Sequence, residues 1–199
     1  MPTMNIDKLL HIQSNKLEPQ KGKILISEPL MSDFYFGRSV VLLVEHTHDE
    51  GSFGIIMNKV IGRTLNEVAE GFPEFDAPVY LGGPVQQNNL FYIHQLGDLI
   101  PQSERIMEGL YWGGDVETLR SMMETGHLKP NQIRFYLGYS GWDAGQLNSE
   151  LERNSWLVSN ASVLSLMQTS SHLMWRHFVR RMGSPYEKWL KLPEDPSLN

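Results

Sequence analysis

A short, unbroken aliphatic run at residues 40–44, Val-Val-Leu-Leu-Val, constrains the fold more than any other feature of the sequence. The run predicts a strand over residues 39–45, and because no polar residue interrupts it, other parts of the molecule should cover both of its faces. Residues 46–51 have turn composition, and residues 53–58 favour a second strand. The region as a whole therefore predicts a long hairpin within a buried sheet.

The rest of the chain mixes predicted strands and helices without a regular alternation. Further strands are expected at residues 22–27, 79–81, 90–94, 133–139 and 156–158. Helices are expected at residues 5–13, 64–70, 115–125 and 146–152, and a last one from about residue 162 or 171 to residue 182. Other segments are expected to be an irregular or weakly extended stretch at 99–112, a glycine-rich turn at 138–145 and a frayed tail at 191–199. Hairpin-linked strands among unevenly placed helices predict the α+β class.

Composition narrows the possible functions. The 199 residues suit a single compact domain over residues 1–199, with an N-terminal helical extension at 1–20 and a C-terminal tail at 184–199. The chain has no cysteine, which excludes disulfides, cysteine nucleophiles and thiolate metal sites. Its net charge of −6 disfavours nucleic acid as a partner. No run is apolar enough to span a membrane and no signal-peptide core is present, so we expect a cytoplasmic protein.

The glycine-rich segment around Ser140 invites comparison with the nucleophile elbow of serine hydrolases. An elbow needs glycine two residues after the serine, and this chain has Trp142 there, so the motif is broken. One alternative is architectural, with Ser140 or Asp143 capping the helix that begins near Gln146. Another is a binding loop, in which Ser140, Gln146 and helix N-terminal amides hold an anion or a polar ligand.

Two other polar segments are weaker candidates for a site. His46 and His48 would face the same way in an extended segment, and Glu45 lies beside them, but a hairpin tip is polar in any case. We therefore expect no metal site and no cofactor. Residues 82–84, Gly-Gly-Pro, lack the spacing of a phosphate loop and favour a backbone turn.

Basic residues gather on the last predicted helix, at Arg176, His177, Arg180 and Arg181. They are the best candidates for contact with nucleic acid or an acidic partner. However, basic residues near the end of a helix also complement its dipole, and no second helix completes a helix-turn-helix. We favour the structural interpretation.

Several of these segments together resemble one family. The segments are Pro29, Asp33, Phe36, residues 39–46, Gly51, residues 54–59, residues 82–85, residues 138–142, residues 145–147, Glu150 and Trp156. Their order and spacing are similar to those of the bacterial YqgE/AlgH family from about Gly22 to Met182, and Gly-Tyr-Ser-Gly-Trp at 138–142 is the most specific part. Two positions depart from the usual pattern, because Val60 replaces a common proline and Asn148 replaces a common glutamate.

The resemblance implies a cytoplasmic α+β protein whose bent, mixed sheet forms a partial barrel flanked by helices. The function of the family is not established, and one branch is labelled a putative transcriptional regulator linked to alginate production. No catalytic residues are agreed for the family, so none are carried over. The Asn148 departure argues against any role that needs a carboxylate at that position.

Our first hypothesis is a non-catalytic domain that binds an unidentified protein or small molecule, with its oligomeric state left open. Polar residues and one tryptophan at predicted strand ends and turns would form the site. These residues are Glu45, His46, Asn58, Ser140, Trp142 and Gln146. The alternatives are a transcriptional regulator that uses Arg176, Arg180 and Arg181, and a hydrolase that uses Ser140.

Overall fold

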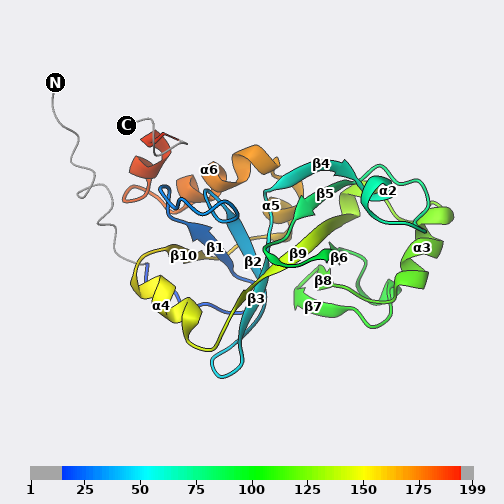
Figure 1. Ribbon diagram of the computed structural model, residues 1–199, viewed down its shortest axis with the longest axis horizontal. Helices are drawn as coiled ribbons and strands as arrows, with labels where there is room; N and C mark the ends of the chain where they lie inside the picture. The colour runs from blue at the N-terminus through cyan, green and yellow to red at the C-terminus, as the bar shows by residue number, and fades with distance from the viewer. Residues whose placement is uncertain (1–14, 194–199) are drawn as a thin grey trace.

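The structure is a computed structural model that describes residues 15–193 (Figure 1). The helix predicted over residues 5–13 lies outside the described residues. Within them, one large sheet carries helices on its faces, which confirms the α+β class. None of the described helices is long and apolar enough to cross a lipid bilayer.

The described part of the chain forms strands β1 to β10 and α-helices α2 to α6. The strands are β1 (Ile24–Ser27), β2 (Val40–Thr47), β3 (Gly51–Ile56), β4 (Val60–Thr64), β5 (Pro78–Leu81), β6 (Val85–His94), β7 (Glu104–Met107), β8 (Leu110–Trp112), β9 (Ile133–Trp142) and β10 (Trp156–Ser159). The α-helices are α2 (Leu65–Val68), α3 (Val116–Glu124), α4 (Gln146–Glu152), α5 (Val163–Gln168) and α6 (Ser171–Arg181).

The sheet has the strand order β10-β1-β2-β3-β9-β6-β8-β7, with β4 and β5 as a branch on β9. It is mixed, because β5 runs parallel to β9 whereas the other pairs of the described chain are antiparallel. Strand β9 pairs with β5 and β6 along its first part and with β3 near its end. This long strand therefore joins two sections of an open sheet whose edges are β10 and β7 (Figure 1).

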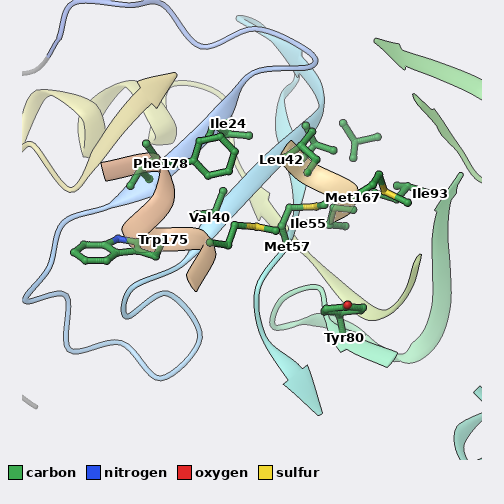
Figure 2. Packing of buried hydrophobic residues seen from close by; sticks show 14 of the residues in the cluster. Ile24, Val40, Leu42, Ile55, Met57, Tyr80, Ile93, Met167, Trp175 and Phe178 are labelled. Carbon is green, nitrogen blue, oxygen red and sulfur yellow. The ribbon is translucent and has the colours of Figure 1, made fainter. Parts of the chain in front are cut away.

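Strand β2 is buried on both faces, as its aliphatic run predicts. Val40 and Leu42 pack into a cluster with Phe178 of α6, which Figure 2 shows from close by. Val41 and Leu43 point to the opposite face and pack with Trp156 and the α4 side of the molecule. The predicted hairpin of β2 and β3 is confirmed as well.

The glycine-rich turn predicted at residues 138–145 is wrong over most of its length. Strand β9 continues through Trp142, and the turn occupies only residues 143–145 before α4. Gly138 adopts a φ of +70°, which lets the backbone bulge and then continue as a strand. Ser140 is therefore a residue within the sheet and does not stand at a strand-to-helix turn.

Gly82 and Gly83 are required because their backbone lies against β9. A Cβ atom on Gly82 would collide with the carbonyl oxygen of Gly138, and one on Gly83 would collide with the backbone of Tyr139. The Gly82 carbonyl also accepts the backbone N–H of Ile56 at 2.9 Å. Residues 82 and 83 thus connect β3 to β9. The two glycines, predicted to form a turn, are needed because the two backbones lie in close contact.

Three further expectations agree with the structure only in part. The interval at 99–112, expected to be irregular or weakly extended, contains the hairpin of β7 and β8, whose short strands carry little periodic signal. The last helix starts at Ser171, which confirms the later of the two predicted starts; residues 163–168 form a separate helix, α5, because the backbone is extended at Thr169. Of the tail predicted to fray at 191–199, Lys191 ends a 3-10 helix that begins at Glu187 and Leu192 is buried, whereas residues 194–199 lie outside the described residues.

Candidate binding groove

A groove of about 740 Å³ opens where the ends of β3, β6, β8 and β9 meet. Its floor is aromatic and its rim is polar, with three carboxylates. The lining residues used below are Glu45, Glu50, Phe53, Phe91, Trp112, Tyr139, Gly141, Trp142, Asp143 and Gln146. We call this hollow the aromatic groove.

Four strands place the rings of the aromatic groove. Phe91 of β6 stacks on Trp112 of β8, with ring centroids 5.4 Å apart and planes 19° apart. Phe53 of β3 meets Trp112 edge-on at 5.6 Å, and Tyr139 of β9 meets both phenylalanine rings edge-on. These offset and edge-to-face contacts fix the rings, because each ring edge is attracted to the face of its neighbour.

Gly141 keeps the floor of the groove open. It pairs directly with Phe53 across β3 and β9, so no side chain fills the space beside that ring. A Cβ atom here would meet only the Tyr139 ring, at 3.5 Å, and the Val85 side chain, at 3.9 Å. These are ordinary van der Waals distances. The glycine is therefore replaceable without backbone strain, and its side of the groove can be filled by mutation.

The rim of the groove is acidic. Glu45 bonds to the Lys21 ammonium group at 2.7 Å, and this hydrogen bond lowers the pKa of the Glu45 carboxyl. Glu50 and Asp143 form no ion pair with any described residue. Two exposed carboxylates therefore lie beside the aromatic rings without a positive partner in the described part of the chain.

Trp142 is a core anchor at the edge of the groove. Its indole N–H donates to Glu150 Oε2 at 2.9 Å, and the same oxygen accepts the Trp156 indole N–H at 2.7 Å. Gln146 donates to the other Glu150 oxygen at 3.0 Å and accepts the backbone N–H of Asp143. Glu150 thus connects α4 to strands β9 and β10 through the two indole N–H groups.

The structure buries Ser140 within the sheet. Its side chain is fully buried, and its hydroxyl donates to the Gly82 carbonyl at 3.1 Å. His46 lies elsewhere, with Nδ1 2.7 Å from Ser52 Oγ, and burial lowers the pKa of its imidazole. Neither residue lines the aromatic groove. A serine-hydrolase arrangement at Ser140 therefore has neither access nor an adjacent base in this structure.

The remaining predicted site residues lie apart from the groove. Asn58 uses its amide oxygen for the Val40 N–H and its amide nitrogen for the Arg38 carbonyl, so its bonds are architectural. Arg176 lines a different hollow, whereas Arg180 and Arg181 are exposed near the end of α6 and line neither. Over residues 15–193, no three His, Asp or Glu side chains are grouped closely enough to hold a metal ion.

Sequence reasoning missed all four aromatic residues of the groove floor. They come from four strands, and one of these strands, β8, lies in the stretch predicted to be irregular or weakly extended. Their sequence neighbours are unremarkable, so only the register of the sheet brings the rings together. The single signal available was the small residue Gly141 two positions after Tyr139, which would share a face with it in a strand, but the prediction placed Gly141 in a turn.

The fold and the groove define a class: a mixed α+β domain with a cleft at the strand ends that is lined by aromatic rings and carboxylates. Ser52, whose hydroxyl lies 2.7 Å from His46 Nδ1, is also among the residues that line it. The family model described as AlgH-like matches residues 24–187, and the chain belongs to this family.

Relatives and solved structures agree with this assignment. A UPF0301 protein of Parabacteroides distasonis is 44% identical over 197 residues, which cover 98% of both chains. One from Bacteroides thetaiotaomicron is 44% identical and covers 98% of this chain and 100% of its own. The solution structure of the AlgH protein from Pseudomonas aeruginosa matches with a TM-score of 0.69 and 29% identity, over 85% of this chain and 93% of that one. A crystal structure from Corynebacterium diphtheriae, at 23% identity, shares the fold with a TM-score of 0.72 over 94% and 98% of the two chains.

Proposed function

We propose that the protein is a binding domain without catalytic chemistry, and that its aromatic groove takes a ligand group with a positive charge on an apolar body. The observation that carries the proposal is the arrangement of four aromatic rings beneath the carboxylates of Glu50 and Asp143.

Size and chemistry support this ligand class. Grooves that hold small molecules or peptide side chains span roughly 300–1,000 Å³, and the aromatic groove falls in this range. Aromatic ring faces attract organic cations through their quadrupole, and nearby carboxylates add to that attraction. A ligand that presents an arginine, lysine or quaternary ammonium group next to an apolar body would satisfy both features.

The test is a calorimetric titration of the full chain with matched probes. Benzyltrimethylammonium and the dipeptide amide Phe-Arg share the required chemistry and distinguish a small molecule from a peptide. Benzoate and benzyl alcohol have similar rings without the positive charge. We expect the two cations to bind and the two controls to bind at least about tenfold more weakly.

Variants connect this binding to the groove. Gly141→Val should fill the floor and abolish cation binding while leaving the melting temperature nearly unchanged. Glu50→Gln combined with Asp143→Asn should weaken it about fivefold, whereas Glu124→Gln on exposed α3 should not. Equal binding of benzoate, or full cation binding by Gly141→Val, would refute the proposal.

Two finer expectations accompany it. A role in transcription would require DNA binding through Arg176, Arg180 and Arg181, and a mobility-shift assay at low salt tests it directly. The exposure of Arg180 and Arg181 is the feature that favours this second function. We also expect the protein in the cytoplasm, which cell fractionation would establish.

A further inference from the structure

A second hollow, of about 520 Å³, lies between the loop before β2, the residues after β3 and the start of α6. We call it the basic cavity. Its lining is Pro29, Met31, Ser32, Asp33, Gly37, Arg38, Asn58, Lys59, Ser171, His172, Trp175 and Arg176. It shares no lining residue with the aromatic groove, and the function proposed above does not use it.

Three cationic side chains converge on the basic cavity, and each is oriented by a backbone carbonyl. Lys59 Nζ donates to the Gly37 carbonyl at 2.7 Å, and Arg38 Nη2 donates to the Leu192 carbonyl at 2.7 Å. The Arg38 guanidinium also stacks on the buried Trp175 ring, 4.9 Å from its centroid. The positions of these charges are therefore set by the fold, which lowers the entropy lost when they bind a ligand.

Arg176 is the third cation. Its Nη1 donates to the Leu190 carbonyl at 3.3 Å, and this is the one hydrogen bond that the described residues give it. A guanidinium carries several further N–H donors in one plane, which matches the geometry of a phosphate or carboxylate group. Arg176 thus anchors one edge of the cavity and keeps donors for a ligand.

The start of α6 adds main-chain donors. This helix has 11 residues, and its N-cap Ser170 makes no side-chain cap bond, because the Ser170 hydroxyl pairs with His172 Nδ1 at 2.9 Å. The first N–H groups of a helix have no acceptor within the helix. Ser171 and His172 line the cavity, so these N–H groups and the positive end of the helix dipole lie beside the three cations.

Among residues 15–193, Asp33 is the one carboxylate that lines the basic cavity. Its Oδ1 is engaged by the backbone N–H groups of Tyr35 and Phe36, at 2.8 and 3.0 Å. The described side chains that line the cavity thus carry three cations and one carboxylate, while the whole chain has a net charge of −6. This local reversal of charge is what a small anion would recognise.

We infer that the basic cavity is a binding site for a small phosphorylated molecule. Arginine, lysine and a helix N-terminus are the groups that proteins use for phosphate, and the cavity is larger than a bare phosphate requires. A concave site with few cations, on a chain that repels polyanions, fits a phosphate monoester better than a nucleic-acid backbone. The exposed Arg180 and Arg181 do not line it, so of the three arginines named for DNA binding only Arg176 belongs to this site.

Calorimetry of the full chain with glycerol 3-phosphate, inorganic phosphate and glycerol tests the inference. Glycerol 3-phosphate should bind with a submillimolar Kd that weakens with added salt, inorganic phosphate more weakly, and glycerol not at all. Arg176→Gln should weaken glycerol 3-phosphate binding about tenfold. Arg180→Gln, which removes an exposed charge from the same helix, should change it less than about twofold.

A variant that binds more tightly provides a control, because a misfolded protein would lose affinity and not gain it. Asp33→Asn keeps an oxygen acceptor for the two backbone N–H groups and removes the negative charge, so affinity should rise about threefold. No binding at about 10 mM glycerol 3-phosphate by wild type and Asp33→Asn would overturn the inference. Equal losses in Arg176→Gln and Arg180→Gln would overturn it too, because they indicate diffuse attraction to a basic surface.

Discussion

The aromatic groove and the basic cavity are built in different ways. The groove stands on paired strands, so its rings are positioned by the register of β3, β6, β8 and β9. The cavity lies between a loop and the start of a helix, and backbone carbonyls of other segments hold its cations. Changes to the strands that carry the groove, which we call the groove frame, should therefore alter stability and binding together. Changes to the cavity should alter binding with little loss of stability.

Gly82→Ala should have the largest effect and test the first half of that contrast. The new methyl group would collide with the Gly138 carbonyl where β3 and β9 are joined, and we expect a loss of about 3 kcal/mol or more in unfolding free energy by urea denaturation. Gly62→Ala is the matched control. Gly62 has a φ of +70° with open space around it, so only backbone strain of about 1 kcal/mol should appear. Similar losses for both variants would mean that the groove frame is not tightly packed.

Glu150→Ala should have the next largest effect. It leaves two largely buried indole N–H groups, on Trp142 and Trp156, without their acceptor, which should cost about 2 kcal/mol of unfolding free energy. The cavity counterpart is Arg176→Gln, for which we expect less than about 1 kcal/mol. Urea denaturation of both variants measures the contrast, and a larger loss for Arg176→Gln would reverse it.

Acidification should lower the unfolding free energy, because His94 of β6 is buried as a neutral ring. Its Nδ1 accepts the Leu96 N–H while Nε2 lies 3.0 Å from the Gly113 carbonyl, an arrangement that needs a neutral ring. Burial lowers the pKa of His94, so below about pH 6.5 the unfolded chain binds a proton that the folded chain resists. Stability should therefore fall as the pH drops below that value, by at most about 1.4 kcal/mol per pH unit for this group.

The measurement is urea denaturation at pH 7.5 and pH 5.5 for wild type, His94→Gln and His127→Gln. The first variant should lose part of the pH dependence, although it is less stable at neutral pH. His127 is exposed, so the second should retain the dependence of the wild type. An unchanged pH dependence in His94→Gln would show that other groups cause it.

Lys21→Gln should have the smallest effect on stability. Its ion pair with Glu45 is partly exposed, so less than about 0.5 kcal/mol should be lost, and only above the pH range where Glu45 becomes protonated. Because the pair lowers the pKa of Glu45, its contribution is complete above about pH 4.5 and disappears in stronger acid. Releasing Glu45 should strengthen cation binding in the groove by about twofold, measured by calorimetry with benzyltrimethylammonium. Weaker cation binding would contradict the acidic-rim interpretation.

Local patterns predicted much of the frame. The run at residues 40–44 predicted a strand buried on both faces, and Asp115 predicted the start of α3, where its carboxylate accepts the Thr118 N–H at 2.7 Å. These features depend on interactions within a few residues or on burial alone. The prediction that Gly138 belongs to a turn failed, because a positive φ occurs in bulged strands as well as in turns.

The candidate sites were much less predictable. Glu45, Trp142 and Gln146 do line the aromatic groove, but Ser140 is buried and Asn58 holds backbone groups. Both hollows depend on segments far apart in the chain. Their residues meet only through sheet register and helix docking, and no local pattern in one sequence records those distances.

The position of β1 has a consequence for how the chain acquires its shape during synthesis. One neighbour, β2, follows closely, but the other, β10, is separated from it by most of the domain, with Ile24 opposite Ser159. When only the chain through β3 has left the ribosome, the edge of β1 that will pair with β10 has no partner strand and is prone to mispairing. Native assembly on that side waits for the late arrival of β10, so folding should be slow for a domain of this size and should benefit from a chaperone that shields the waiting edge.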